Sequence, residues 1–515
     1  MGMVEVCLFG DTGGALAVHT PIDALVAQYK KSREDIERIA AYVAGETDVM
    51  HFFLTGAMVE HNISSISTTS LFQVEPAIRA LDASYWAQVM LLTDVLECMP
   101  AGKRNEWNEQ IRKHKTPPFE ADSVKATVET LLSQRAQYLA ERVDGLFRIL
   151  SGEHVTNAPQ AFGKRMIISY MLTGYGSLCS DRANYVHDLR CVIAKFMGRD
   201  APNARITHND LGAIHSGGRH GEWHSFDGGA FKLRLYKKGT AHMEIHPDMA
   251  WRPNSVLAWM YPLAIPPEFR QKPAKASKQH DLDLDLVSYK TLMEIREGRL
   301  NRQGNELFFS EPAKPAAASV LQYLGGVPEG RFVWAFDYDV EGVLAELQRT
   351  GVLPERKSHQ YYPTPEGLAE KAAELAQIGG HDTVLEPSAG QGGIAKFLPT
   401  DRTTCVEISR LHCAVLESRG YKAECADFLI WGSGRQFDRI ILNPPFSDGR
   451  ATDHVRRAAS MLAANGRLVA ILPASYRGKN VVEGMEHEWS EVFPGEFKGS
   501  GVSVAILVLT GRRHG

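Results

Sequence analysis

The sequence predicts an α/β protein made of a doubly wound sheet domain at the C-terminus and a mainly helical α+β region before it. Two observations carry this prediction. Over about the first 200 residues, apolar side chains recur every three or four positions, which is typical of amphipathic helices. From about residue 354, short runs of Val, Ile and Leu alternate with helical segments, which indicates a parallel sheet with helices on both faces.

Length and composition fit a soluble protein of several domains. The 515 residues are 44% hydrophobic and 23% charged, which is ordinary globular usage. No apolar run is long enough for a membrane span, and no secretory signal is visible, so we expect a cytoplasmic protein without membrane contact. Seven cysteines without a CxxC pair argue against a disulfide framework or a thiolate zinc site. With a net charge of −4, any nucleic-acid contact must be concentrated in local basic patches.

Composition shifts divide the chain into five expected parts. Residues 1–200 are expected to form a mainly helical domain, and residues 201–264 a His/Gly-rich α+β segment. Residues 265–280 are rich in proline and basic residues and have few apolar residues, which predicts an exposed linker. A small mixed segment, 281–353, connects this linker to the sheet domain at 354–515.

The segment 201–264 carries a candidate nucleic-acid surface. Two runs, Phe231–Tyr236 and His242–Ile245, predict a strand pair joined by a turn at 237–239. Cations interleaved with aromatic rings suit phosphate contact and base stacking, although solvated faces fit equally well. The candidate DNA-binding residues are Arg219, Trp223, Lys232, Arg234, Lys237 and Lys238. The six histidines of 208–247 lack a regular ligand spacing, so no metal site is predicted.

A glycine-rich turn follows the first predicted strand of the sheet domain. The strand 383–385 runs into Glu386-Pro387-Ser388-Ala389-Gly390-Gln391-Gly392, and a helix is expected after it. Glycines at this place let the backbone turn sharply and let a nucleoside ligand approach closely. The spacing matches neither the dinucleotide fingerprint nor the phosphate-binding loop of ATPases, so NAD and ATP are less natural ligands.

Acidic and aromatic residues follow the next strands. Glu407 ends the second strand, 403–406, where a carboxylate can accept hydrogen bonds from ribose hydroxyls. Asp427 can accept from an adenine amine, and Phe428 can pack against the ring. These positions predict a site for an adenosine-containing ligand.

The strand 437–442 delivers Asn443-Pro444-Pro445-Phe446 at its C-terminal end, the edge of an open α/β sheet where ligands bind. The prolines stiffen the loop. The Asn443 amide and the Pro444 carbonyl can accept hydrogen bonds from an exocyclic NH2, and Phe446 offers a face on which an extruded base can stack. The loop therefore predicts chemistry on a planar amine, driven by positioning and electrostatics.

Five motifs in this order resemble those of class I S-adenosylmethionine-dependent methyltransferases: YPTP at 362–365, VLEPSAGQGG, CVEIS, ADFL and FDRIILNPPF. The motif order is similar to that of the gamma group of amino-methylating DNA adenine methyltransferases, over about residues 355–510. YPTP departs slightly from the commoner YTPP or FTP. The resemblance implies S-adenosylmethionine as cofactor and Asn443, Pro444, Pro445 and Phe446 as the catalytic set. It implies cofactor binding by Tyr362, Pro363, Thr364, Glu386, Pro387, Ser388, Gly390, Gly392, Glu407, Ile408, Asp427, Phe428 and Asn443.

The N-terminal region resembles the DUF4942 type of module, which precedes methyltransferase domains in phage and prophage proteins and brings no mechanism. The expected function is therefore transfer of a methyl group to N6 of adenine in double-stranded DNA, in a bacterial or phage-infected cell. It would be modification of the restriction-modification or phage type, without a nuclease of its own. Alternatives are an RNA base or a protein glutamine as acceptor, or a catalytically idle DNA-binding antirestriction protein.

Overall fold

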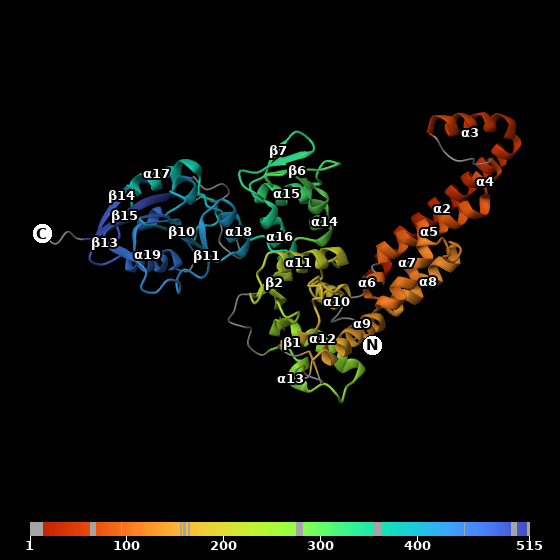
Figure 1. The fold of residues 1–515 in the computed structure, drawn as a ribbon, viewed down its shortest axis with the longest axis horizontal. Coiled ribbons are helices and arrows are strands. Elements are labelled where there is room, and N and C mark those ends of the chain that lie inside the picture. The colour runs from red at the N-terminus through yellow and green to blue at the C-terminus, as the bar shows by residue number, and fades with distance from the viewer. Residues whose placement is uncertain are drawn as a thin grey trace. The chain divides into compact units, whose positions relative to one another are not determined.

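The computed structural model describes residues 14–61, 68–93, 95–154, 157, 161–162, 165–273, 282–354, 362–446, 449–495 and 502–511. The chain forms two compact units, whose elements are labelled in Figure 1. Unit 1 comprises residues 1–211, 218–224 and 230–280. Unit 2 comprises residues 212–217, 225–229 and 281–515.

The N-terminal half is mainly helical, as predicted from its apolar spacing. The helices α2 (Gly14–Gly45), α5 (Val74–Thr93) and α8 (Ala121–Ser133) share one apolar cluster around the fully buried Trp86. The indole nitrogen of Trp86 donates to the carbonyl of Pro117 at 2.8 Å, so its burial leaves no unpaired donor. The other helices are α3 (Thr47–His61), α4 (Thr68–Leu71), α6 (Val95–Cys98), α7 (Ala101–Arg112), α9 (Arg135–Gly152), α10 (Ser180–Phe196), α11 (Ala204–Ser216) and α12 (Pro247–Met260).

A four-stranded sheet follows, with strand order β1-β4-β3-β2. Its strands are β1 (Arg165–Ile168), β2 (His224–Phe226), β3 (Phe231–Leu235) and β4 (Ala241–Ile245). The predicted hairpin is confirmed: β3 pairs antiparallel with β4, and Gly239 supplies the turn with a φ of 84°.

The structure corrects the predicted boundary after residue 200. β1 pairs antiparallel with β4, so residues 201–264 complete a sheet that begins before that boundary and do not form a separate segment. Within the predicted linker 265–280, a one-turn helix α13 (Pro267–Arg270) is present, and residues 274–280 lie outside the described residues.

Residues 282–354 form a small module within unit 2. Its sheet has the order β5-β6-β8-β7, made of β5 (Arg299–Leu300), β6 (Glu306–Phe308), β7 (Val327–Glu329) and β8 (Val333–Ala335). Its helices are α14 (Tyr289–Glu297), α15 (Pro315–Tyr323) and α16 (Glu341–Thr350). The turn η1 (Asp227–Gly229) joins this module through Gly228, whose carbonyl accepts from the Asp283 backbone at 2.7 Å. A Cβ on Gly228 would lie 2.1 Å from the Asp283 carbonyl, so only glycine fits there.

The C-terminal domain is built on a seven-stranded sheet with the order β11-β10-β9-β12-β13-β15-β14. Strands β9 to β13 run parallel, and β15 pairs antiparallel with both β13 and β14. The strands are β9 (Val384–Pro387), β10 (Thr403–Glu407), β11 (Lys422–Cys425), β12 (Phe437–Leu442), β13 (Leu462–Pro473), β14 (Met485–Phe493) and β15 (Val504–Gly511). This topology agrees with the predicted doubly wound sheet.

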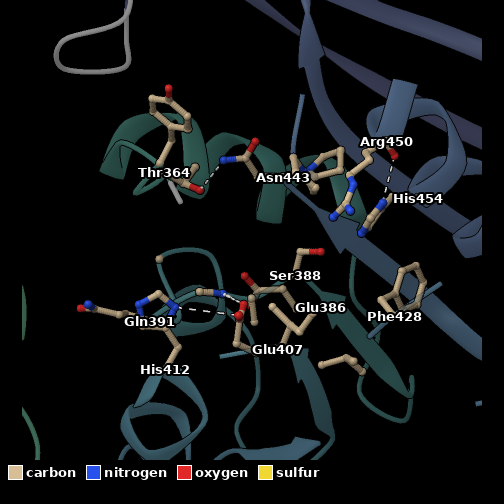
Figure 2. A pocket seen from close by; sticks show the side chains of 18 of the residues that line it. Thr364, Glu386, Ser388, Gln391, Glu407, His412, Phe428, Asn443, Arg450 and His454 are labelled. Atoms are coloured by element: carbon tan, nitrogen blue, oxygen red, sulfur yellow. Dashed lines mark hydrogen bonds and ion pairs between the residues drawn. The ribbon is translucent and has the colours of Figure 1, made fainter. Parts of the chain in front are cut away.

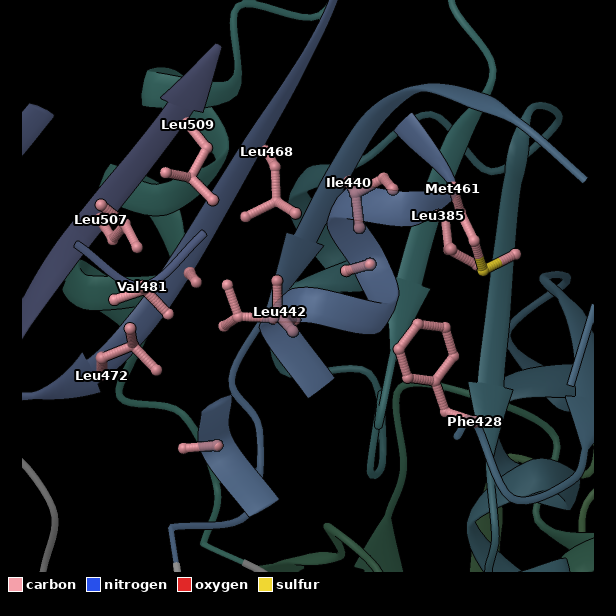
Figure 3. Close-up of a cluster of buried hydrophobic side chains, with 14 of the residues drawn as sticks. Leu385, Phe428, Ile440, Leu442, Met461, Leu468, Leu472, Val481, Leu507 and Leu509 are labelled. Atoms are coloured by element: carbon pink, nitrogen blue, oxygen red, sulfur yellow. The ribbon is translucent and has the colours of Figure 1, made fainter. Parts of the chain in front are cut away.

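Helices cover both faces of this sheet. α17 (Glu366–Ala376) packs on one face, where Leu368 and Ala372 meet Ile506. α19 (Arg450–Ser460) packs on the other, where Val455 belongs to the same cluster as Ile440 and several leucines of the strands. Figure 3 shows Ile440 and these leucines. Each fully buried aliphatic side chain contributes about 1.5–3 kcal/mol of transfer free energy, so both faces hold the strand ends firmly in place.

The structure corrects one local expectation. No regular α-helix follows the glycine-rich turn directly; residues 388–394 form turns that lead into the short 3₁₀ helix η2 (Ala395–Phe397). Gly392 and Gly393 are poor helix formers, and Pro399 follows soon after, so a helix has little room to propagate. The next helix, α18 (Arg410–Ser418), begins only after β10.

Candidate active site

The candidate site lies where β9, β10 and β12 end. The chain runs outward from β9 to β10 and β11 on one side and continues with β12 on the other, so β9 and β12 flank the topological switch point of the sheet. A cavity of about 980 Å³ opens at this place. Figure 2 shows Thr364 and Asn443 on one wall and Glu386 and Glu407 on the opposite wall.

The glycine-rich turn forms the floor of the cavity through left-handed backbone conformations. Gly390 has a φ of 56° and Gly392 a φ of 85°. Ser388 also takes a positive φ, 58°, although it carries a side chain. The backbone amide of Gly390 donates to Oε2 of Glu407 at 2.8 Å, which links the turn to the end of β10.

Two buried carboxylates face this floor. Glu407 also accepts from the Ser409 amide at 2.8 Å, so two backbone donors hold its carboxylate. Glu386 is 2% exposed, and its Oε2 has no hydrogen-bond partner among the described residues. Burial raises the pKa of both carboxyls, and the nearby Glu407 raises the pKa of Glu386 further. A cationic ligand would offset the electrostatic cost of ionising these two buried carboxyls, whereas an anionic ligand would increase that cost.

The Asn443 side chain is oriented by a residue far away in sequence. Its Nδ2 donates to the Thr364 hydroxyl at 3.0 Å, just before helix α17 (Figure 2). Because the amide nitrogen is engaged, Oδ1 is the atom left to accept a hydrogen bond. Pro444 is buried, and Phe446 packs partly against the apolar clusters on both sides of the sheet. The loop is therefore a stiff support for an acceptor oxygen.

The far end of the cavity combines an aromatic ring with a cation. Phe428 is 3% exposed and packs in the core, with the His454 ring 5.7 Å away. Asp427 is exposed beside it, and its Oδ1 accepts from the Leu429 amide at 2.9 Å. Arg450 is exposed at the start of α19, and Figure 2 shows its side chain extending between Asn443 and His454.

The small module 282–354 contacts two parts of the cavity lining, the glycine-rich turn and helix α18. The Tyr323 hydroxyl donates to the Pro354 carbonyl at 2.6 Å and lies 2.8 Å from Nε2 of His412. The rings of Tyr323 and His412 stack with an interplanar angle of 19°, and Nδ1 of His412 is 3.9 Å from Glu407. The Gln391 amide donates to the Tyr323 carbonyl at 2.9 Å, so one tyrosine contacts both the glycine-rich turn and α18.

The structure brings most of the predicted site residues together. The cavity is lined by the predicted residues Tyr362, Pro363, Thr364, Glu386, Ser388, Gly390, Glu407, Ile408, Asp427, Phe428, Asn443, Pro444, Pro445 and Phe446. Pro387 and Gly392 do not line it. The sequence reasoning missed Gln391, His412, Arg450 and His454, which also line the cavity. Gln391 lies inside the glycine-rich motif and could have been predicted from it. No pattern in the sequence marks His412 of α18 or His454 of α19 as a site residue.

The candidate DNA-binding residues lie on the β3–β4 hairpin and in the loop before β2. Arg234 packs against Trp223 and Tyr236, and Lys237 and Lys238 are exposed in the turn. Lys232 lies directly opposite Glu244 in the strand pair. Arg219 is exposed, and it does not line the hollow formed by the hairpin turn.

Within the described residues, no group of three or more His, Cys, Asp or Glu side chains is placed to hold a metal ion. None of the described helices is long and apolar enough to span a membrane.

S-adenosylmethionine fits this cavity. It carries an ammonium, which can donate to the unpartnered Oε2 of Glu386, and ribose hydroxyls, which can donate to the Glu407 carboxylate. Glu407 would hold the ribose, Asp427 the adenine amine, and Glu386 with the glycine-rich turn the methionine end. NAD and ATP would place phosphates against the same carboxylates, which is unfavourable.

Comparisons with known proteins match two separate parts of the chain. Residues 78–263 match the family model described as "Domain of unknown function (DUF4942)". A tRNA1(Val) (adenine(37)-N6)-methyltransferase from Edwardsiella ictaluri is 30% identical over 132 residues, which cover 22% of this chain and 47% of that protein. The chain thus spans about half the length of this curated relative.

The similar solved structures are more distant. A putative RNA methyltransferase from Pyrococcus horikoshii is 20% identical, with a TM-score of 0.27, and the match covers 32% of this chain and 90% of that one. TrmN from Thermus thermophilus is 19% identical, with a TM-score of 0.25, and the match covers 36% of this chain and 57% of that one. At these scores the structural likenesses assign no activity to this chain.

Proposed function

We propose that this chain is an S-adenosylmethionine-dependent methyltransferase that modifies N6 of adenine in double-stranded DNA. The observation that carries the proposal is the Asn443 amide, which lines the cavity at the switch point of the sheet and whose nitrogen donates to the Thr364 hydroxyl, so that its oxygen is the acceptor available to an amine. The buried pair Glu386 and Glu407 supports a cationic cofactor in the same cavity. We further propose that the chain acts in modification of the phage or restriction-modification type, without its own nuclease.

The loop residues orient the acceptor. Oδ1 of Asn443 and the carbonyl of Pro444 accept the two hydrogens of the adenine amine, which withdraws the nitrogen lone pair from the ring and points it into the cavity. When bound, S-adenosylmethionine would supply an electrophilic methyl carbon: the C–S bond would break as the C–N bond forms, and the methylated amine would release one proton to solvent water. Phe446 supports the base by stacking, which offsets part of the cost of extruding it. Positioning and electrostatics supply the rate enhancement, so no strong base is needed.

An RNA base is the second candidate acceptor, because the Edwardsiella relative is named a tRNA adenine N6-methyltransferase. The loop holds a planar amine in the same way in either nucleic acid. DNA is preferred because the ordered motifs resemble the gamma group of DNA enzymes.

The test uses the whole chain with methyl-labelled cofactor and four separate acceptors: unmethylated duplex DNA, the same DNA as single strands, bulk tRNA, and a glutamine-rich protein mixture. We expect label in duplex DNA. Label in tRNA alone would establish the RNA candidate instead. Label in protein alone, or cofactor binding without transfer to any acceptor, would overturn the proposal.

Replacing Asn443 tests the mechanism. Asn443→Ala removes the acceptor oxygen, so we expect kcat to fall at least about 100-fold, comparable to losing a positioned hydrogen-bonding group in other active sites. Calorimetry should show a cofactor affinity close to that of the unchanged protein. Equal losses of kcat and cofactor affinity would place Asn443 in cofactor binding rather than in acceptor binding.

A further inference from the structure

The outer face of the sheet in unit 1 carries a concentration of positive charge. β3 and β4 alternate between buried and half-exposed residues, so Arg234 and His242 share the open face and lie directly opposite each other. Glu244, on the same face, forms an ion pair with Arg165 of β1 at 2.7 Å. Its charge is therefore already compensated, and Arg234 has no carboxylate across from it on β4.

Aromatic rings hold the Arg234 guanidinium in place. Its central carbon lies 4.5 Å from the centre of the Trp223 ring and 5.0 Å from that of Tyr236. Its Nε is buried and has no hydrogen-bond partner among the described residues. Tyr236 in turn meets His242 edge to face, with ring centres 4.8 Å apart. Stacking fixes the cation without neutralising it, which preserves its charge for a ligand.

A hollow of about 880 Å³, open to solvent, adjoins this stack. Lys237, Lys238, His220, His242 and Tyr236 are among the residues that line it, and no carboxylate does. The pKa of His242 is lowered by burial and then by Arg234 and Arg165, which is consistent with a positive local field. The whole chain has a net charge of −4, so two lysines in a lining without a carboxylate are a local concentration of positive charge rather than the general surface.

We infer that this hollow, together with the Trp223–Arg234–Tyr236 stack, binds the backbone phosphate and an adjacent base of the nucleic-acid acceptor. The two turn lysines supply phosphate contacts, and the rings supply a stacking surface that a free phosphate would not use. The inference rests on the proposed function, because it takes the partner to be the nucleic acid that the C-terminal domain methylates. It gives the DUF4942 segment the role of holding that nucleic acid.

The test measures binding of a fluorescent duplex DNA to the whole chain without cofactor, by anisotropy over a range of salt concentrations. In the double variant Lys237→Ala/Lys238→Ala we expect at least a tenfold loss of affinity, and a salt slope smaller by about two because each phosphate contact contributes about 0.9. The control is Lys30→Ala/Lys31→Ala, an adjacent exposed pair on α2, which should change neither quantity.

Two further measurements keep the outcome unambiguous. Arg234→Lys keeps the charge but loses the planar stack, so it should weaken binding while its thermal unfolding matches that of the double variant. Inorganic phosphate at millimolar concentration should compete weakly, whereas a short oligonucleotide should compete fully; equal competition would indicate a site for free phosphate. Unchanged affinity in the Lys237/Lys238 double variant would overturn the inference.

This failure is distinguishable from failure of the proposed function. Loss of DNA binding in the double variant, in a protein that transfers no methyl group to any acceptor, would leave the inference standing and remove the proposed function. Methyl transfer to DNA by the unchanged protein, with unchanged DNA binding in the double variant, would support the proposed function and overturn the inference.

Discussion

At the scale of single residues, one hydrogen bond decides how the proposed acceptor site is oriented. The Asn443 amide can rotate by half a turn, and only one orientation presents oxygen to an amine. In the structure Thr364 accepts from Nδ2 at 3.0 Å, which is the orientation that leaves Oδ1 to accept from an amine. The two residues are far apart in the sequence, and the fold brings them together because α17 starts beside the end of β12.

Replacing Thr364 should therefore act through Asn443. Thr364→Val keeps the shape of the side chain but removes the acceptor, so we expect kcat to fall about tenfold, in keeping with the loss of roughly 1.5 kcal/mol from one hydrogen bond. Thr364→Ser retains the hydroxyl and should recover most of the rate. Steady-state kinetics on both variants tests this role. If kcat falls as much in Thr364→Ser as in Thr364→Val, the hydroxyl does not orient Asn443.

The second prediction at this scale concerns pH. Burial and Glu407 hold the pKa of Glu386 well above 4.5, so Glu386 is protonated over part of the range above pH 4.5. A cationic cofactor favours the ionised form, and its affinity should therefore rise as pH increases through the raised pKa of Glu386. Calorimetry in buffers with different ionisation enthalpies should show proton release on binding.

The matched variant is Glu386→Gln, which should abolish this pH dependence and weaken cofactor binding at least about tenfold at neutral pH. Its effect on the stability of the cofactor-free protein should have the opposite sign: the variant binds the cofactor more weakly but folds more stably. A raised pKa in the folded state means that the contribution of Glu386 to stability is lost as pH rises through that pKa. The cofactor-free variant should therefore unfold at a higher temperature than the unchanged protein at pH 8. A variant that is both less stable and pH-dependent in cofactor binding would contradict this role.

At the scale of elements, the module 282–354 is part of the cofactor site rather than a spacer. α15 ends at Tyr323, whose carbonyl accepts from Gln391 and whose hydroxyl meets His412. A second contact reinforces the first: Arg419 of the C-terminal domain lies 2.8 Å from Asp337 and packs over the Tyr338 ring. The sequence predicted a connecting segment here, because nothing in its composition points to the glycine-rich turn.

Removing the Tyr323 hydroxyl should show this support. Tyr323→Phe keeps the stacked ring but frees His412, so we expect KM for S-adenosylmethionine to rise about three- to tenfold while kcat changes little. Tyr289→Phe is the control, since it removes a hydroxyl that bonds Asp227 elsewhere in the same unit. If the two variants raise KM equally, the loss reflects the general stability of the unit, and the Tyr323 hydroxyl has no specific role in cofactor binding.

At the scale of the whole molecule, the sequence predicted the C-terminal fold well because its strands, turns and polar strand ends follow directly from local patterns. The glycine-rich turn, Glu407 and the Asn443 loop lie together because parallel strands end at one edge of a sheet. The unit boundaries were harder to predict. β1 and β4 pair across many intervening residues, and the turn η1 leaves its own sheet to join unit 2, so both depend on contacts that no local pattern encodes.

The same limit applies to the choice of acceptor. The net charge and the motifs indicate the chemistry, whereas the partner depends on how side chains from several strands gather on a surface. Arg234 and His242 meet only because of the register of β3 and β4. Lys232 lies opposite Glu244 in the same register, a pairing that the sequence alone does not show.

The most direct test of the central claim is the identity of the methylated nucleoside. Duplex DNA is incubated with the whole chain and a cofactor carrying a deuterated methyl group, digested to nucleosides, and analysed by mass spectrometry against a parallel sample treated with Asn443→Ala. We expect deuterated N6-methyl-2′-deoxyadenosine with the unchanged protein and none with the variant. Deuterium on cytosine, on no nucleoside, or on adenine equally with the variant would contradict it.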